Sequence, residues 1–451
     1  MRKTQFWNTI FQMFCYVAIS IMIGTLIMIS VYALPTEPMF RHVKESAARI
    51  EREGKTFPSD SWVGDLTFTH TKLNSWSDHI MLMQAIYPVS GSVIREAMLN
   101  RRWLPAISDV NMTDTLIRNL NENMDENIEL NYQQLRSTDG TIDVSGNSII
   151  YPRYWHGYLT ILKPLLMIAN VSCIRLINYY FQCALMVAAI ILFYKKLGVA
   201  YVVAFTIVLL TLNPVTLAMT FQLDAVVYIM LLSVILSLWK NKWLFEKKLY
   251  PLFFLFIGIL TAFFDFFTFP LVGFGIPWLV YCILNKHHFQ GGSSITDLCF
   301  HFFCWAFGYA GMWCGKWFVS WFLTGYNVFY DAYLHIGHRI SHTNFIGEHV
   351  TPFEAVAMNC AAFLFDPLAF AFLVIYICCV YYVFRTKRIK KCKQYFFPVF
   401  IVACCPFFWY MLLCNHSYIS LGETYRHLVV TMFAALCLII EILQDDDGVI
   451  P

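Results

Sequence analysis

Long apolar runs constrain this chain more than any other feature of its sequence. Runs of about 18 or more apolar residues recur along most of its length, and a helix of that size crosses the ~30 Å hydrocarbon core of a bilayer. Hydrophobic residues make up 58% of the chain and charged residues 14%, which lies outside the range of soluble globular proteins. The alternating pattern of a membrane barrel is absent from the sequence. We therefore predict an all-α polytopic membrane protein.

The apolar runs predict about ten transmembrane helices. They lie near residues 10–34, 172–194, 198–216, 219–239, 250–265, 269–285, 297–323, 357–384, 395–414 and 424–443. The first follows "MRK" and has no small-residue cleavage site before "LPTEP", which indicates a retained span and not a cleaved signal. Lys163 and Pro164 interrupt residues 158–170, so this segment either enters the membrane as a partial span or lies on it.

Lysine and arginine in the short loops set the expected orientation, because cationic loops stay on the cytoplasmic side. The clusters "MRK", "YKKLG", "WKNKWLFEKK", "NKHH" and "FRTKRIKKCK" fall in one consistent register. Both termini are therefore predicted to be cytoplasmic, with the protein in the plasma (inner) membrane. The chain then divides into a first transmembrane helix (1–34), a large extracytoplasmic loop with interfacial helices (35–157) and a multi-helix transmembrane bundle (158–451).

The start of the large loop has the pattern of an amphipathic helix. Apolar residues recur near helical spacing from Met39 to Ile50, with Pro38 in the first turn and Gly54 placed to end the helix. Such a helix either lies along the outer membrane surface or packs on the rest of the loop. The polar, amide-rich segment 111–148 predicts soluble helices and turns.

Polar residues in the apolar part of the chain gather near the expected outer ends of the spans. Charged side chains within membrane helices are costly and usually face a cavity or one another. The residues concerned are Arg153, His156, Lys163, Arg175, Asp224, Asp265, Lys316, His335, His338, His416, Glu423, Arg426 and His427. Any binding or chemistry is therefore expected on the outer face.

The chemistry of this set suits an anionic headgroup on a long lipid tail. Arginine and lysine hold phosphate oxygens, while the tail stays in the hydrocarbon. Asp78, in "NSWSDHIMLMQAIYP", stands at the edge of an apolar segment that is too short to cross a membrane. An acid in that place could take a proton from an attacking hydroxyl.

Several short motifs resemble the GT-C superfamily of multi-pass membrane glycosyltransferases, and in particular an uncharacterised bacterial group of such proteins. They are an aspartate before "ML" (Asp78), "RYWHGY" (Arg153–Tyr158), "IRLIN" (Ile174–Asn178), "FDF" followed closely by proline (Phe264–Pro270) and a late "NHS…YR" (Asn415–Arg426). The resemblance covers nearly the whole chain. It implies transfer of a sugar, with inversion, from a polyprenyl-phosphate-linked donor to an extracytoplasmic glycan, lipid or polymer acceptor.

The same resemblance assigns roles to residues and partners. Asp78 is the expected catalytic base, and eight residues are expected to bind substrate. These are Arg153, His156, Lys163, Arg175, Asp265, His416, Glu423 and Arg426. Membrane lipids surround the protein, no cofactor is certain, a divalent cation is left open, and the basic loops are explained by topology without nucleic acid.

These residues also allow other interpretations. Asp78 could cap its own helix, Arg153 and Arg175 could extend to lipid headgroups, and Glu423 could pair with Arg426. The histidines at 335, 338, 342 and 349 have spacings that could surround a metal. A transporter or flippase of a lipid-linked saccharide would need similar outer cations, and a membrane scaffold is the third class.

Overall fold

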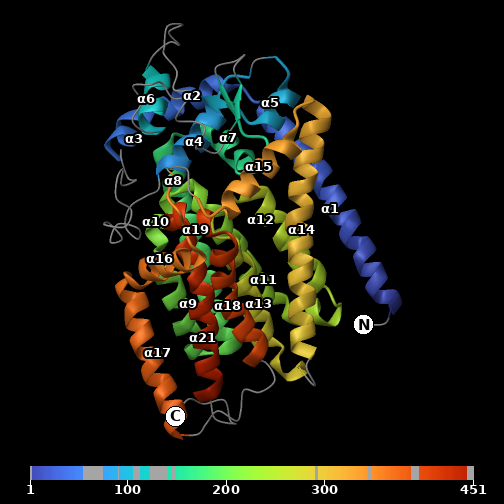
Figure 1. Cartoon of the computed structure of the whole chain (residues 1–451), viewed down its shortest axis with the longest axis vertical. Helices are drawn as coiled ribbons and strands as arrows, with labels where there is room; N and C mark the ends of the chain where they lie inside the picture. The colour runs from blue at the N-terminus through green and yellow to red at the C-terminus, as the bar shows by residue number, and fades with distance from the viewer. Residues whose placement is uncertain are drawn as a thin grey trace.

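The computed structural model describes residues 3–53, 75–89, 91–104, 112–121, 141–143, 148–289, 293–343, 347–386 and 396–443. Helices dominate these residues, as expected for a helical membrane protein. Short helices and strands gather at one end of an elongated molecule, above a bundle of longer helices (Figure 1). α1 (Lys3–Tyr32) begins, and α21 (Leu428–Leu443) ends, away from that upper end. Gly54, the expected end of the first loop helix, is outside the described residues.

The upper end, which we call the cap, consists of the described elements between residues 36 and 168. Its helices are α2 (Thr36–Glu45), α3 (Ala47–Glu53), α4 (Ser75–Ile86), α5 (Val93–Leu99), α6 (Met112–Asn121) and α7 (Leu159–Ile168). Its strands are β1 (Arg102–Trp103), β2 (Thr141–Asp143) and β3 (Ser148–Ile150), which pair antiparallel in the order β1-β3-β2. The expectation of helices and turns in the later part of the loop missed this sheet, because strands of two or three residues are too short to show alternation.

The amphipathic segment at the start of the cap is divided in two. α2 buries Met39 and Val43 on one face, and it ends at Ser46, where α3 begins directly afterwards. His42 bonds through Nδ1 to the carbonyl oxygen of Leu166 in α7 at 2.7 Å. α2 therefore packs on α7, and its expected place along the outer membrane surface stays a prediction.

The bundle consists of helices of 16 residues or more and of shorter helices. The longer ones are α1 (Lys3–Tyr32), α8 (Val171–Leu197), α11 (Phe221–Glu246), α14 (Ser293–Thr324), α17 (Pro367–Thr386), α18 (Phe396–Leu412) and α21 (Leu428–Leu443). The shorter ones are α9 (Val199–Thr211), α10 (Pro214–Met219), α12 (Tyr250–Phe264), α13 (Leu271–Leu284), α15 (Val328–Ile340), α16 (Pro352–Leu364), α19 (Cys414–Ile419) and α20 (Leu421–Thr424). Two 3-10 turns, η3 (Lys286–His288) and η5 (Tyr425–His427), complete it.

Four helical stretches of the described chain are long and apolar enough to cross a membrane. They are Trp7–Tyr32, Val171–Leu197, Phe221–Glu246 and Leu421–Leu443. A fifth is reached when α16 and α17, which meet at 99°, are counted as one broken span. Several other predicted spans correspond to apolar helices of 10–17 residues, including α9, α12, α13 and α18. The membrane class is supported, while the number of ten spans stays a prediction.

The span predicted near 357–384 is in fact two helices. Its bend lies at Asp366, whose carboxylate accepts the backbone N–H groups of Leu368 and Ala369 at 2.7 and 3.3 Å. Asp366 thus caps α17, and Pro367 occupies the first turn, where a missing N–H costs nothing. The sequence "FDP" therefore marks a helix start inside a run that hydropathy alone treats as continuous.

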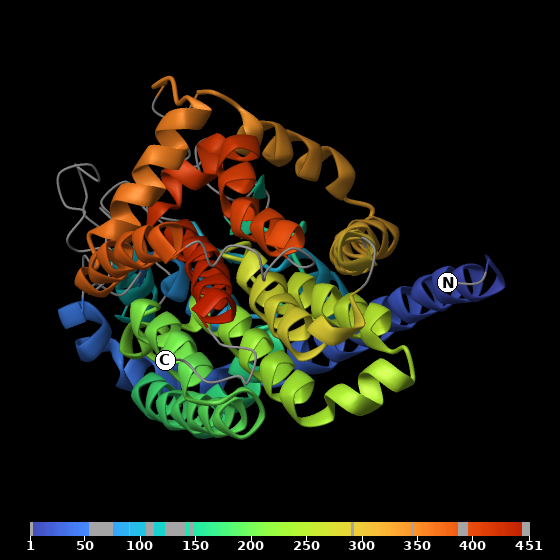
Figure 2. The same ribbon diagram turned by 90° about the horizontal axis from the view of Figure 1, so that it is seen from below.

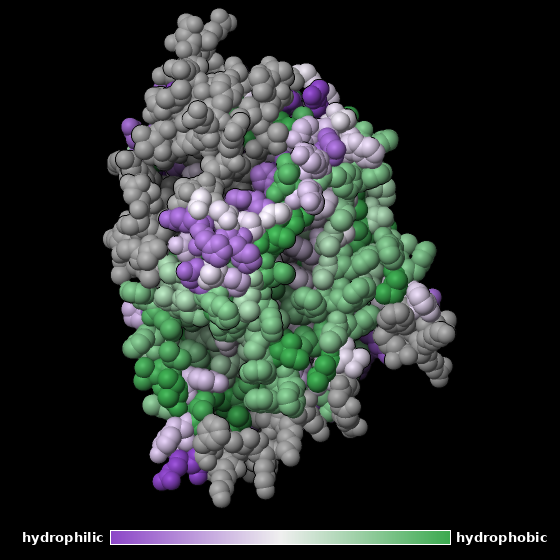
Figure 3. Space-filling model, viewed as in Figure 1, coloured by the Kyte–Doolittle hydropathy of each residue, from purple (hydrophilic) through white to green (hydrophobic). Residues whose placement is uncertain are grey.

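The surface of the bundle matches a membrane environment. Apolar side chains form a broad band around the middle of the molecule, and polar side chains show mainly above and below it (Figure 3). Viewed from below, α21 lies near the centre, packed against α9, α13 and α18 (Figure 2). Large apolar side chains that point outward from α1, such as Phe11 and Leu26, are 70% and 64% exposed, which suits contact with lipid.

The closest helix crossing joins α12 to α14 through two glycines. A Cβ added to Gly258 would stand 2.0 Å from the carbonyl oxygen of Trp305, and one added to Gly308 would stand 2.3 Å from that of Leu255. Both distances are far below van der Waals contact with backbone atoms. Small residues at such crossings let two membrane helices approach closely, so these glycines set the separation of α12 and α14.

Replacing Gly258 with alanine is expected to lower the free energy of unfolding by about 1–3 kcal/mol, because backbone must move to admit the methyl group. Gly337→Ala is the matched control, since nothing lies within 4 Å of its added Cβ. The control should be neutral or slightly stabilising, by up to about 1 kcal/mol, in helix α15. Thermal unfolding in detergent compares the two variants, and equal losses of stability would contradict the close crossing.

Candidate functional site

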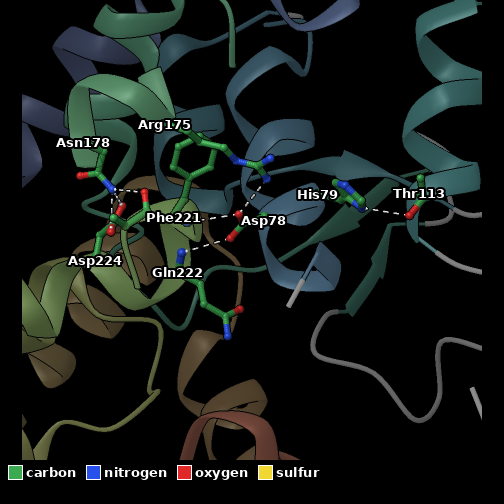
Figure 4. A network of polar contacts seen from close by, with 9 residues as sticks. Asp78, His79, Thr113, Arg175, Asn178, Phe221, Gln222 and Asp224 are labelled. Atoms are coloured by element: carbon green, nitrogen blue, oxygen red, sulfur yellow. Dashed lines mark hydrogen bonds and ion pairs between the residues drawn. The ribbon is translucent and has the colours of Figure 1, made fainter. Parts of the chain in front are cut away.

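Asp78 connects the cap to the beginning of a membrane helix. It lies in the first turn of α4 and is completely buried. Its two carboxylate oxygens accept the backbone N–H groups of Phe221 and Gln222, both at 3.2 Å, which are the first residues of α11 (Figure 4). These N–H groups have no partner within their own helix, and a negative charge at a helix start is favourable. Asp78 therefore caps α11 from a different element.

Arg175 completes this contact from a third element. It lies near the start of α8, is 2% exposed, and places Nη2 3.4 Å from Asp78 Oδ2. Its guanidinium also stands 5.6 Å from the ring centre of Phe221. We call Asp78, Arg175 and the first turn of α11 the carboxylate latch. It holds the cap against α8 and α11 by a charged pair that is removed from water.

Burial changes the proton affinity of Asp78. Loss of water raises the pKa of its carboxyl to about 6, and Arg175 with the two backbone N–H groups offsets part of that rise. A carboxyl with this pKa is ionised at neutral pH but gains a proton under mild acid. The sequence allowed Asp78 to be either a catalytic base or a cap of its own helix. The structure adds a cap of α11, which no local pattern indicated, and the role as base stays a prediction.

A second group of polar residues lies among aromatic rings where the cap meets the bundle. Arg339, in the last turn of α15, is its centre: Nη2 donates to the Tyr154 hydroxyl at 2.9 Å, and Nη1 donates to Nδ1 of His416. The guanidinium carbon lies 4.8 Å from the ring centre of Phe267. Arg339 was not predicted as a site residue. It directly follows His338, one of the polar residues expected near the outer ends of the spans.

Arg153 stands on the other side of Tyr154. Its Nη1 lies 3.2 Å from Asp331 Oδ2 in α15, and both side chains are buried. Its guanidinium carbon lies 4.4 Å from the ring centre of Tyr151 and 5.7 Å from that of Tyr154. Arginine on aromatic faces is a recurrent favourable contact. We call Arg153, Arg339, His416 and the rings of Tyr151, Tyr154 and Phe267 the arginine–aromatic cluster.

The protonation state of His416 follows from its partners. A guanidinium only donates, so Nδ1 accepts from Arg339 and the proton sits on Nε2, which donates to the Phe267 carbonyl at 3.2 Å. Burial, and then the charge of Arg339, hold the pKa of His416 well below its usual value. His416 is therefore neutral and accepts a hydrogen bond from Arg339.

The loop that carries Arg153 is fixed by a close approach to the end of α12. Gly157 donates its N–H to the Phe263 carbonyl at 2.8 Å, and a Cβ added to Gly157 would stand 2.3 Å from that oxygen. The preceding residue, His156, has a left-handed backbone with φ 53°. Its ring bonds to the Tyr151 carbonyl at 2.8 Å and to the Tyr158 hydroxyl at 2.9 Å. Burial lowers the pKa of His156 well below its usual value.

Asp265 shapes the second loop of the cluster. It follows α12 directly, and its carboxylate accepts the hydroxyl of Thr268 at 2.6 Å and the N–H of Thr268 at 3.2 Å. This turn holds Phe267 at φ 66°, a conformation that a residue with a side chain rarely adopts. Asp265 therefore positions the Phe267 ring and carbonyl that Arg339 and His416 contact.

Three of the predicted substrate-binding residues make other contacts. Lys163 Nζ donates to the Ala85 carbonyl at 2.7 Å and lies 4.7 Å from the ring centre of Tyr32, so it joins α7 to α4 and α1. Arg426 donates to the carbonyl of Gly422 and lies over the Tyr425 ring, in place of the considered pair with Glu423. The structure thus brings Arg153, His156, Asp265 and His416 together, and Arg175 belongs to the carboxylate latch.

The histidines of the α15–α16 connection do not gather around a metal position. His342 and His349 stack with ring centres 6.0 Å apart, and His335 Nε2 lies 3.7 Å from Asp331 Oδ1. Across the described parts of the chain, no three His, Cys, Asp or Glu side chains are placed to hold a metal ion.

Comparison with known proteins adds no relative. The chain matches no protein-family model, no curated protein and no solved structure.

The carboxylate latch predicts strong coupling between Asp78 and Arg175. Arg175→Leu leaves a buried carboxylate without its guanidinium and should cost about 3–5 kcal/mol of stability near neutral pH. The double variant Asp78→Asn, Arg175→Leu should recover most of that loss, because no unpaired charge remains. Unfolding in detergent measures all four corners of the cycle. Additive effects of the two changes would rule out the coupling.

The same latch predicts a pH dependence with a definite sign. The pKa of Asp78 is about 6 in the folded protein and 3.8 in its ordinary state, so ionisation costs the folded state stability as pH rises between these values. Wild-type protein should therefore gain stability when pH falls from about 7 to about 5, relative to Asp78→Asn. Thermal unfolding of both proteins across this range checks it. Parallel curves would contradict the raised pKa.

Proposed function

We propose that this protein transfers a sugar from a polyprenyl-phosphate-linked donor to an extracytoplasmic glycan, lipid or polymer acceptor. The observation that carries the proposal is the arginine–aromatic cluster. It combines two guanidinium groups with a wall of aromatic rings at the place where apolar helices meet the polar cap. The proposal places this site on the outer face of the plasma membrane, with both termini cytoplasmic.

The cluster has the chemistry that a lipid-linked sugar phosphate requires. A guanidinium presents a planar set of donors that matches phosphate oxygens. Arg339 is only partly buried, and its guanidinium carries the positive charge of the pair because the His416 ring beside it is neutral. Tyr154 and Phe267 pack with Trp313 at ring-centre distances of 5.4 and 5.3 Å, and aromatic faces of this kind stack well on the apolar faces of sugar rings.

The surroundings of the cluster also suit a substrate with two parts. Its members come from the loop before α7, the α12–α13 connection, α15 and α19, so the ends of apolar helices stand directly beside it. α15 and the neighbouring α14 carry exposed apolar side chains, for example Phe329 at 42% and Phe318 at 54% exposure. A polyprenyl tail can remain against such a surface while its phosphate contacts arginine.

Asp78 is the proposed base in this scheme. Its pKa of about 6 suits a group that accepts a proton near neutral pH. Both of its oxygens are engaged by α11 and Arg175, so an attacking hydroxyl has to displace one of these contacts. Binding of the acceptor hydroxyl at Asp78 would therefore break one hydrogen bond of the carboxylate latch.

A transporter or flippase of a lipid-linked saccharide is the second candidate. It is favoured by polar residues that lie within two of the four span-length helices. Asn178 and Gln182 in α8 face Asp224 in α11, where a pure scaffold would have apolar contacts.

Replacing Arg339 tests the donor site. A charge-assisted hydrogen bond contributes about 1.5–3 kcal/mol, so Arg339→Ala should raise the KM for the lipid-linked donor roughly 10- to 100-fold. Arg339→Lys should rescue little, because a single ammonium cannot reproduce the planar contacts. Arg385→Ala, at an exposed position in the last turn of α17, is the matched control. Transfer of labelled sugar by purified protein provides the measurement, and an unchanged KM for Arg339→Ala would exclude the cluster as the donor site.

The role of Asp78 is tested separately from donor binding. If Asp78 is the base, transfer should increase as pH rises through about 6, and Asp78→Asn should abolish transfer at normal membrane levels. Cells with this variant should lose one sugar substituent of the envelope and accumulate the polyprenyl-phosphate sugar. An unchanged envelope glycan would remove Asp78 from the chemistry and favour the transporter.

A further inference from the structure

A second acidic group, Asp224, lies one helical turn beyond the carboxylate latch. Asp224 is in the first turn of α11, and its carboxylate faces the Asn178 side chain of α8 (Figure 4). Asn178 Nδ2 lies 2.8 Å from each carboxylate oxygen, and the amide nitrogen of Gln182 lies 2.5 Å from Oδ1. Both helices belong to the four stretches that are long and apolar enough to cross a membrane. A carboxyl group in that environment is costly when it is charged.

The orientation of the Asn178 amide is determined by its other contacts. Its Nδ2 also donates to the Ala218 carbonyl at 2.9 Å, which can only accept. Its Oδ1 accepts the hydroxyl of Tyr228. Asn178 thus presents a donor to Asp224 whatever the charge of the carboxyl.

The orientation of the Gln182 amide is not determined in this way. Gln182 is completely buried, and its Oε1 has no hydrogen-bond partner. Oxygen and nitrogen of an amide are exchanged by a simple rotation. With its oxygen turned toward Asp224, Gln182 accepts a hydrogen bond from a protonated carboxyl.

The charges around Asp224 give an independent reason for a proton. The charged groups that face it are Asp78 from α4 and Arg175 from α8. Arg175 is already paired with Asp78 at 3.4 Å, so two carboxylates share one guanidinium. A single bound proton makes this buried group neutral, whereas its absence leaves one negative charge without a counter-charge.

We propose that Asp224 is a proton-binding site, with the proton on the carboxyl oxygen that faces Gln182. A metal cation suits the position less well, because Asn178 directs N–H groups at the carboxylate. Proton uptake requires only that the Gln182 amide rotates, since the Asn178 contacts persist in both states. The inference does not rest on the proposed sugar transfer, and it assigns this chain a group that can take up and release a proton where α8 and α11 begin.

Dicyclohexylcarbodiimide is a suitable probe, because it is apolar and reacts with protonated carboxyl groups. The acid proton moves to one nitrogen of the reagent, the carboxyl oxygen bonds to its central carbon, and nothing leaves. Purified full-length protein in lipid vesicles is treated at neutral and alkaline pH, and the labelled peptide is identified by mass spectrometry. Asp366→Asn is the matched control, since Asp366 is a buried carboxylate that caps α17 through backbone N–H groups.

We expect labelling of Asp224 at neutral pH that disappears at alkaline pH, is lost in Asp224→Asn and persists in Asp366→Asn. Sodium chloride in place of choline chloride should not change it. Infrared spectroscopy reads the same group without reagent access, and Asp224→Asn should remove one protonated-carboxyl band. Protection by sodium at constant pH would overturn the proposal in favour of a cation. An unlabelled Asp224 together with an unchanged infrared band, in protein that elutes as a folded species, would also overturn it.

Discussion

The architecture depends on how the N–H groups at the start of a membrane helix obtain hydrogen-bond partners. The first N–H groups of any helix lack partners, and in an apolar setting water cannot supply them. α11 begins beside the cap, and Asp78 accepts its N–H groups from outside the helix. Because Asp78 is charged and buried, it needs Arg175 in turn. One unsatisfied helix end therefore fixes the relative positions of α4, α8 and α11.

The arginine–aromatic cluster depends on a different constraint, which is backbone held in unfavourable conformations. His156 and Phe267 both have positive φ, which costs free energy for residues with side chains. The Gly157 contact with Phe263 and the Asp265 contact with Thr268 hold these two loops in place. Such strain is kept where the surrounding structure overdetermines it, and at Phe267 it directs the ring at Arg339 and the carbonyl at His416.

The carboxylate latch and Asp224 are linked through the charge of Arg175. Arg175 serves Asp78 directly and also faces Asp224, so a proton on one carboxyl changes the electrostatic environment of the other. The proposed base, Asp78, would work beside the carboxyl of Asp224, which is neutral with a bound proton and negative without one. This arrangement offers a physical reason for two acids and one arginine at the boundary between cap and bundle. The arginine–aromatic cluster, by contrast, contains arginines, which stay charged, and His416, whose pKa lies well below its usual value.

The sequence by itself determined the membrane class, because apolar runs of span length have no other stable environment. It also predicted the amphipathic face of α2 and a set of polar residues near the outer ends of the spans, from which the structure groups Arg153, His156, Asp265 and His416. Only the tertiary structure decided that Asp78 caps α11, since its partners lie more than 140 positions away in the chain and backbone N–H groups carry no sequence signal. The bend at Asp366 and the role of Arg339 were likewise decided by packing. Hydropathy measures how apolar a segment is. The hydrogen-bond partners of buried polar groups and the angles between helices depend instead on which residues lie close together in the folded chain.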